Sequence, residues 1–244
     1  MSIPKKQISV EVEEALEELG NEFNTTPFNF LVESSIQYRL RDILSDEYNS
    51  TSIDVETKDV TDYKSDYIEA FKDRDSIDRV QTEVNLGKGG DHNDYLVDIC
   101  IFREGKELNA TIKNGSKYFN QDQIQTAIEI KYVKNDNMLG SIWKDDNAPE
   151  NFEELKNIRE NSSDSKQFFK DITKLSQLDA ENKILIVFSN KNILQQPSKS
   201  EDWQEEGVDD KNSGDAIKKL RNVISILHQE GIALREVHIN PEKF

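Results

Sequence analysis

Three charged residues stand in the sequence at positions where strands should be apolar. The segment Tyr95–Phe102 is apolar on both faces of an extended chain except for Asp98. A strand that is apolar on both faces is expected to be buried, and a buried carboxylate is costly unless it is paired or binds a metal. The segment Ala127–Val133 repeats the pattern with Glu129 and Lys131. Each of the three residues therefore requires a partner.

Glu129 and Lys131 are two residues apart, so on a strand their side chains point to the same face, with Cα atoms about 6.5 to 7 Å apart. An ion pair between them is one way to satisfy both charges. For an isolated Glu-x-Lys a structural salt bridge near a sheet edge is the ordinary explanation. Asp98 taken alone is equally compatible with capping a turn or accepting backbone hydrogen bonds. These readings stay open at the level of single residues.

A fourth charged residue, Glu33, belongs to a predicted helix. At 100° per residue it lies within about 60° of Ile36 and still closer to Leu40 and Leu44, so it borders the apolar stripe that faces the core. The carboxylate of Glu33 is then expected to lean over the sheet. Three acids and a lysine from one helix and two strands can converge on one point, and oxygen ligands of this kind suit Mg²⁺ or Mn²⁺.

This arrangement resembles the PD-(D/E)XK nuclease superfamily, which has the restriction-endonuclease-like fold. The resemblance rests on Glu33 in a helix, Asp98 near the middle of a strand and Glu129-Ile130-Lys131 on the next strand, followed by helix and strand. It runs from about residue 33 to residue 189. The sequence departs from the pattern in two ways. Residue 97 is valine where a proline often precedes the aspartate, and the long gap between the two motifs demands an inserted excursion at residues 103–123.

The resemblance implies hydrolysis of phosphodiester bonds by a Mg²⁺- or Mn²⁺-dependent endonuclease, with DNA as the favoured substrate. It implies that Asp98 and Glu129, with the carbonyl of Ile130, coordinate one or two divalent ions that lower the pKa of an attacking water. Lys131 would orient that water or stabilise charge on the phosphorane. Glu33 would be a further metal ligand, directly or through water.

The elements that position these residues follow from hydrophobic periodicity and from turn residues. Helices are predicted at Val10–Phe23 and Phe28–Leu44, the second with Val32, Ile36, Leu40, Ile43 and Leu44 on its apolar stripe. Residues 49–78 are predicted to be a connection with a short helix at Tyr63–Phe71. Strands are predicted at Arg79–Asn85, Tyr95–Phe102, Gln125–Val133, Lys183–Ser189 and Ile232–Ile239, and further helices at Phe168–Leu178 and Gly214–Gln229. Between them, residues 103–123 form a hairpin excursion with some strand near residues 108–112, and residues 135–164 form loop and irregular helix.

This order of elements predicts an α/β fold with a mixed central sheet flanked by helices, a restriction-endonuclease-like core. The strands are spread along the chain with no clean linker, so we expect one domain over residues 1–244. Its core would span about residues 28–190, with an N-terminal helix and a C-terminal helix and strand as extensions.

The charge balance limits what the surface can bind. The chain has 244 residues with 48 Asp and Glu against 31 Lys and Arg, a formal net charge of −17. That excludes a surface that attracts nucleic acid everywhere, but allows a local basic groove in an acidic shell. Lys134, Lys170 and Lys174 are candidates for such a rim, although exposed lysines usually serve solubility. Trp143 and Trp203 are expected to anchor loops rather than stack on bases.

The sequence argues against secretion and membrane insertion. Its single cysteine, Cys100, cannot form an intrachain disulfide, and no apolar stretch near the N-terminus resembles a signal peptide. No apolar run approaches the roughly 18 residues needed to cross a bilayer. We therefore expect a cytoplasmic protein without a membrane role.

Other chemistries find less support. The glycine-rich segment 87–90 lacks the Walker spacing, so a hairpin turn is the better interpretation. His92 lies in that turn and is favoured to have no role, since three histidines and one cysteine supply too few ligands for zinc. No Gly-x-Ser-x-Gly elbow supports serine-nucleophile catalysis.

Two non-enzymatic alternatives remain open. A catalytically silent module of the same fold could bind protein or nucleic acid, with Asp98, Glu129 and Lys131 as a buried network. An acidic protein that mimics DNA would suit the net charge but would leave the Glu-x-Lys pair unexplained. Because cutting both strands of a duplex often uses two active sites, a homodimer is a further expectation for the enzyme.

Overall fold

The computed structural model describes residues 7–26, 29–30, 32–48, 52–61, 76–87, 95–105, 107–113, 116–133, 149–157, 163–189 and 222–238. The helices are α1 (Val10–Thr25), α2 (Glu33–Glu47), α5 (Phe152–Asn157) and α6 (Ser163–Gln177), with a 3₁₀ turn at Gln121–Gln123 and a further helix that includes residues 222–229. The strands are β1 (Ser52–Thr61), β2 (Ser76–Asp78), β3 (Val80–Leu86), β4 (Tyr95–Phe102), β5 (Leu108–Lys113), β6 (Ser116–Phe119), β7 (Ile124–Val133), β8 (Asn182–Ser189) and β9 (Ile232–His238).

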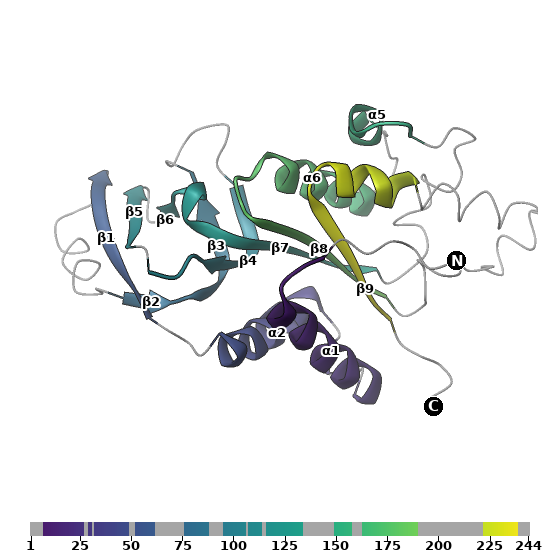
Figure 1. The fold of residues 1–244 in the computed structure, drawn as a ribbon, viewed down its shortest axis with the longest axis horizontal. Coiled ribbons are helices and arrows are strands. Elements are labelled where there is room, and N and C mark those ends of the chain that lie inside the picture. The colour runs from purple at the N-terminus through teal and green to yellow at the C-terminus, as the bar shows by residue number, and fades with distance from the viewer. Residues whose placement is uncertain are drawn as a thin grey trace, which may run out of the picture.

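Within these residues the strands form one nine-stranded mixed sheet with the order β2-β1-β5-β6-β3-β4-β7-β8-β9. In Figure 1, α1 and α2 cover one face of the β4 to β9 part of the sheet, and α6 and the helix of residues 222–229 cover the other. The predicted α/β class, with a mixed central sheet flanked by helices, is confirmed. No helix in the described ranges combines the length and apolarity that membrane crossing requires.

Alternation along β7 and β8 divides the core between the two helical layers. Ile128 and Ile130 of β7 pack with the α1 and α2 residues, whereas Ala127 packs with the α6 residues. Successive side chains on a strand point to opposite faces, so Glu129 and Lys131 share the α6 side with Ala127. The position of both charged side chains thus follows from the period of a strand buried on both faces.

Helix α1 matches its prediction and α2 differs at its start. The buried residues of α1 are those of the predicted stripe: Val12, Ala15, Leu16, Leu19 and Phe23. Helix α2 begins at Glu33 rather than at Phe28, because Val32 has extended backbone angles (φ −138°, ψ 152°). Val32 is also 48% exposed, so its assignment to the apolar stripe was wrong. Glu33 instead lies in the first turn, where the helix dipole favours a negative charge.

The connection predicted for residues 49–78 was wrong in the parts that the structure describes. β1 pairs parallel with β5 and antiparallel with β2, which extends the sheet beyond the predicted strands. The sequence carries a strand signal that the prediction missed, because Ile53, Val55 and Thr57 alternate with the charged residues of the segment. The predicted helix at residues 63–71 lies outside the described residues.

The excursion between β4 and β7 forms part of the sheet. β5 and β6 pair antiparallel, as predicted for a hairpin, and β6 also pairs parallel with β3. The predicted strand near residues 108–112 is therefore confirmed. Helix α6 begins at Ser163, earlier than predicted. Lys134, Trp143, Trp203 and His92 lie outside the described residues.

Candidate active site

The candidate site lies where β4 and β7 separate. Their antiparallel ladder includes the pair Ile99 and Ile128 but no residue pair beyond it toward the start of β4. At that point the backbone N–H of Ile130 donates to Oδ2 of Asp98 at 2.8 Å instead of to a β4 carbonyl. The carboxylate of Asp98 thus replaces a backbone partner. Because the ladder ends here, polar side chains can lie between the two strands.

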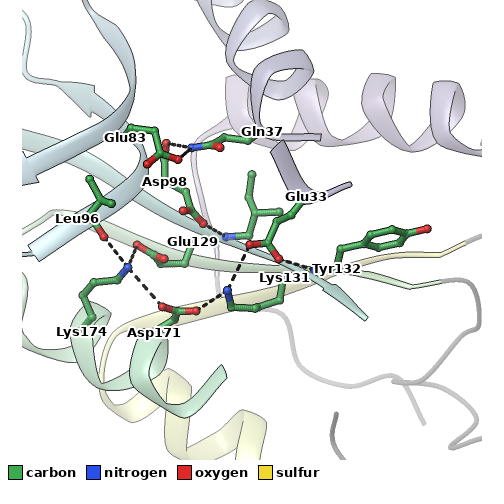
Figure 2. A network of polar contacts seen from close by, with 11 residues as sticks. Glu33, Gln37, Glu83, Leu96, Asp98, Glu129, Lys131, Tyr132, Asp171 and Lys174 are labelled. Carbon is green, nitrogen blue, oxygen red and sulfur yellow. Dashed lines mark hydrogen bonds and ion pairs between the residues drawn. The ribbon is translucent and has the colours of Figure 1, made fainter. Parts of the chain in front are cut away.

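The pairing of β4 with β3 is also irregular at Asp98. The β3–β4 ladder pairs Thr82 with Ile99 and Val84 with Val97 but skips the residues between them. The skipped β3 residue is Glu83, which has a φ of 53°. The buried amide of Gln37 in α2 bridges the gap, donating to the Asp98 carbonyl at 2.7 Å and to Glu83 Oε1 at 2.9 Å (Figure 2).

Backbone strain at Glu83 gives a first testable expectation. A left-handed conformation costs a non-glycine residue about 1 to 2 kcal/mol, which glycine does not pay. We expect Glu83→Gly to be about 1 kcal/mol more stable than Glu83→Ala, because both variants lose the Gln37 contact and only the first relieves the strain. Urea unfolding of the two variants measures the difference, and equal midpoints would show that Glu83 is not strained in solution.

Glu129 is buried beside Lys174 of α6. Its side chain is 1% exposed, and its Oε1 lies 2.6 Å from Nζ of Lys174. The same ammonium donates to the backbone carbonyl of Leu96 at 2.6 Å. Leu96 itself is 48% exposed, so the prediction that β4 is buried on both faces was wrong at its first residues. The separation of β4 from β7 is what exposes this end of the strand.

Lys131 lies between two carboxylates from opposite helical layers. Its Nζ is 2.9 Å from Oδ2 of Asp171 in α6 and 3.4 Å from Oε1 of Glu33 in α2. The other oxygen of Glu33 accepts the N–H of Tyr132 at 3.1 Å. Figure 2 shows Lys131 between Glu33 on one side and Asp171 on the other. Since Lys131 and Asp171 are both buried, this contact is shielded from water.

Burial raises the pKa of both acidic residues, Asp98 and Glu129. Burial raises the pKa of Glu129 well above its usual range, the neighbouring Asp98 charge raises it further, and the Lys174 ammonium opposes both effects. Burial likewise raises the pKa of Asp98, against the hydrogen bond from the Ile130 N–H. A cation would stabilise the ionised form of two such carboxylates, since burial raises the pKa of each and Asp98 raises that of Glu129 further.

The pKa values of the two lysines are also raised, which for a lysine favours the charged form. Burial disfavours the charged form of Lys131, but Asp171 and Glu33 outweigh it and raise the pKa of its ammonium above the ordinary lysine value. The pKa of Lys174 is raised as well, because Glu129 and Asp171 outweigh its burial. Both side chains are therefore cations at neutral pH.

The donor set fits a hard divalent cation. Glu129 Oε1 and Asp171 Oδ2 are buried oxygens without a hydrogen bond of good geometry, although each contacts an ammonium group. Asp98 and Glu129 are adjacent carboxylates, and the Ile130 carbonyl lies between Glu129 and Lys131 in β7. Across the described ranges, no three histidine, cysteine, aspartate or glutamate side chains are grouped closely enough to hold a metal by themselves. Two carboxylates and a backbone carbonyl are thus the ligands that this site offers.

The structure places the four sequence-derived residues in one network. Glu33 contacts the ammonium of Lys131. The carboxylate of Asp98 accepts the backbone N–H of Ile130, and Glu129 lies beside Asp98. The predicted site residues did not include Asp171, although the helical-stripe argument applied to Glu33 would also have found it. On α6, Asp171 lies within about 20° of Leu178 at 100° per residue, on the buried stripe.

Comparison with known proteins gives one distant structural likeness. No protein-family model and no curated protein matches the sequence. Among solved structures, the chain is similar to the cAAA-bound form of NucC from P. aeruginosa ATCC27853, with a TM-score of 0.33 and 9% sequence identity. The likeness covers 75% of this chain and 65% of that one. A likeness at this level supports no inference about function.

Proposed function

We propose that this protein is a metal-dependent nuclease that hydrolyses phosphodiester bonds in DNA. The observation that supports the proposal is the contact of Asp98 with the Ile130 N–H at the point where β4 and β7 separate. It puts one carboxylate against the Glu129-Ile130-Lys131 segment of the next strand. This is the juxtaposition that the resemblance to PD-(D/E)XK nucleases implies.

Asp98, Glu129 and the Ile130 carbonyl would hold a Mg²⁺ or Mn²⁺ ion, which supplies charge neutralisation at the scissile phosphate and a bound water of lowered pKa. The carboxylate of Glu33 accepts the Tyr132 N–H and contacts the Lys131 ammonium. In this proposal its main role is to position Lys131. It would reach a metal ion through water.

Lys131 would act as a fixed positive charge in this mechanism. Its raised pKa keeps it protonated at neutral pH, so it is no general base. Asp171 and Glu33 hold the ammonium from opposite sides, which limits its motion. A preorganised cation of this kind stabilises negative charge that develops on the phosphorane.

Cleavage of a supercoiled plasmid tests the proposal. We expect purified protein to convert supercoiled plasmid to nicked circles and then to linear DNA in Mg²⁺ or Mn²⁺, and to leave it intact in EDTA. Branched and single-stranded DNA, each tested at low and at molar salt, extend the search to other DNA structures. Failure to cleave any of these DNAs with either metal would refute the proposal.

A catalytically silent binding module is the second candidate, and the internal ion pairs favour it specifically. Lys174 neutralises Glu129, and Lys131 neutralises Asp171. Such pairing would be sufficient reason for these charges to exist in a core. Under this alternative the protein binds without cleaving, and removal of divalent metal leaves binding unchanged.

A further inference from the structure

The ammonium of Lys174 lies 2.6 Å from Oε1 of Glu129, a carboxylate of the proposed metal site. We propose that Lys174 is a built-in competitor of the divalent ion, which must displace it from Glu129 to bind. The proposal rests on the proposed metal-dependent function and adds a regulatory element to it: occupancy of the site would be set by a helix residue as well as by the ligands.

The contact of Lys174 with Glu129 is short and well shielded. Nζ lies 2.6 Å from Oε1 of Glu129, whose side chain is 1% exposed, and Lys174 itself is 13% exposed. Glu129 Oε1 is thus held by a close ion pair with one monovalent ammonium group. A divalent cation at the same oxygen would attract it more strongly.

Asp171 offers Lys174 a second partner on the same helix. Its Oδ1 lies 3.4 Å from Nζ of Lys174, one turn away on α6. Asp171 Oδ2 is already next to Lys131, so this carboxylate lies between the two lysines (Figure 2). A small movement of Nζ toward Asp171 would release Glu129 without leaving the ammonium unpaired in a buried site. The cost of displacement is therefore lower than that of expelling an isolated buried charge.

The size of the effect follows from population arithmetic. Apparent affinity equals the intrinsic affinity multiplied by the fraction of molecules in the binding-competent state. If Glu129 is free of Lys174 in about one molecule in ten, removing the ammonium tightens metal binding about tenfold. A lysine that only supports the shape of the site would have the opposite effect, because its loss would loosen the ligands.

The test is Mn²⁺ binding by isothermal titration calorimetry, without DNA. The variants are Lys174→Met and Lys174→Gln, and the matched control is Lys170→Met, which removes an exposed lysine of the same helix. We expect both Lys174 variants to bind Mn²⁺ about tenfold more tightly than the unchanged protein. The control should bind like the unchanged protein, and adding Asp98→Asn should abolish the gain.

Several results would decide the matter. Equal or weaker Mn²⁺ binding by a folded Lys174 variant would overturn the proposal, as would absence of Mn²⁺ binding in every protein. Should Lys174→Met not fold, Lys174→Gln decides, because its amide can still donate to the Leu96 carbonyl. The rise in melting temperature on adding Mn²⁺ is a second readout, and it should be larger in the variant than in the unchanged protein. None of these measurements requires cleavage, so failure of the nuclease proposal is seen separately in the plasmid assay.

Discussion

Asp98→Asn is expected to lower metal-dependent DNA cleavage by about a thousandfold, equivalent to about 4 kcal/mol of transition-state stabilisation. The change removes one anionic ligand from the pair that would hold the metal. It preserves the size of the side chain, and the asparagine Oδ1 can still accept the Ile130 N–H that Asp98 accepts at 2.8 Å. Loss of activity in this variant would therefore reflect loss of charge rather than loss of fold.

Initial rates on supercoiled plasmid at saturating Mg²⁺ measure this effect. The control is Asp122→Asn, which removes an exposed carboxylate from the 3₁₀ turn before β7 and should leave the rate unchanged. Circular dichroism and urea unfolding establish that both variants are folded. Full cleavage activity in a folded Asp98→Asn protein would exclude Asp98 as a metal ligand.

Lys131→Met is expected to abolish cleavage and also to destabilise the protein by about 3 kcal/mol, the lower end of the cost of breaking a buried ion pair. The reason is Asp171, a buried carboxylate that lies 2.9 Å from the Lys131 ammonium. Lys174, 3.4 Å from its other oxygen, compensates only in part. Glu33 contributes less, because its side chain is 42% exposed and water can solvate it.

A second substitution separates the two effects of Lys131. Adding Asp171→Asn to Lys131→Met removes the unpaired charge, so we expect it to restore about half of the lost stability or more, while cleavage stays absent. Urea unfolding and the plasmid assay are run on the same preparations, with Lys170→Met as the control that should shift stability by no more than about 0.5 kcal/mol. Recovery of cleavage in the double variant would show that Lys131 is only structural.

The lysine network explains how so many charges are tolerated in a core. Glu129, Lys131 and Asp171 are each at most 7% exposed, and each has an opposite charge within 3 Å. Buried pairs of this kind are weak contributors to stability, since desolvation offsets much of their attraction. Their presence between α6 and the end of the β4–β7 ladder therefore adds little to the stability of the fold.

Much of the fold could be predicted from local pattern. The strands β4, β7 and β8 are largely apolar runs and the helix α1 has a clear apolar stripe, and their observed bounds differ little from those predicted. β1 was missed although Ile53, Val55 and Thr57 alternate with charged residues, because this short alternation lies in a segment of high overall polarity. Its strand state depends on pairing with β5, more than 50 residues later in the chain.

From the residues alone, Asp98, Glu129 and Lys131 can be recognised as charges in otherwise apolar strands, and charges there require partners. The identity of the partners was decided only by the tertiary structure. Asp171 and Lys174 reach the site because α6 packs across the end of the β4–β7 ladder, and Gln37 reaches it from the opposite layer. The physical reason is that a buried charge is satisfied by whatever group lies nearest in space. Distance along the chain, which is all that a sequence displays, does not measure that proximity.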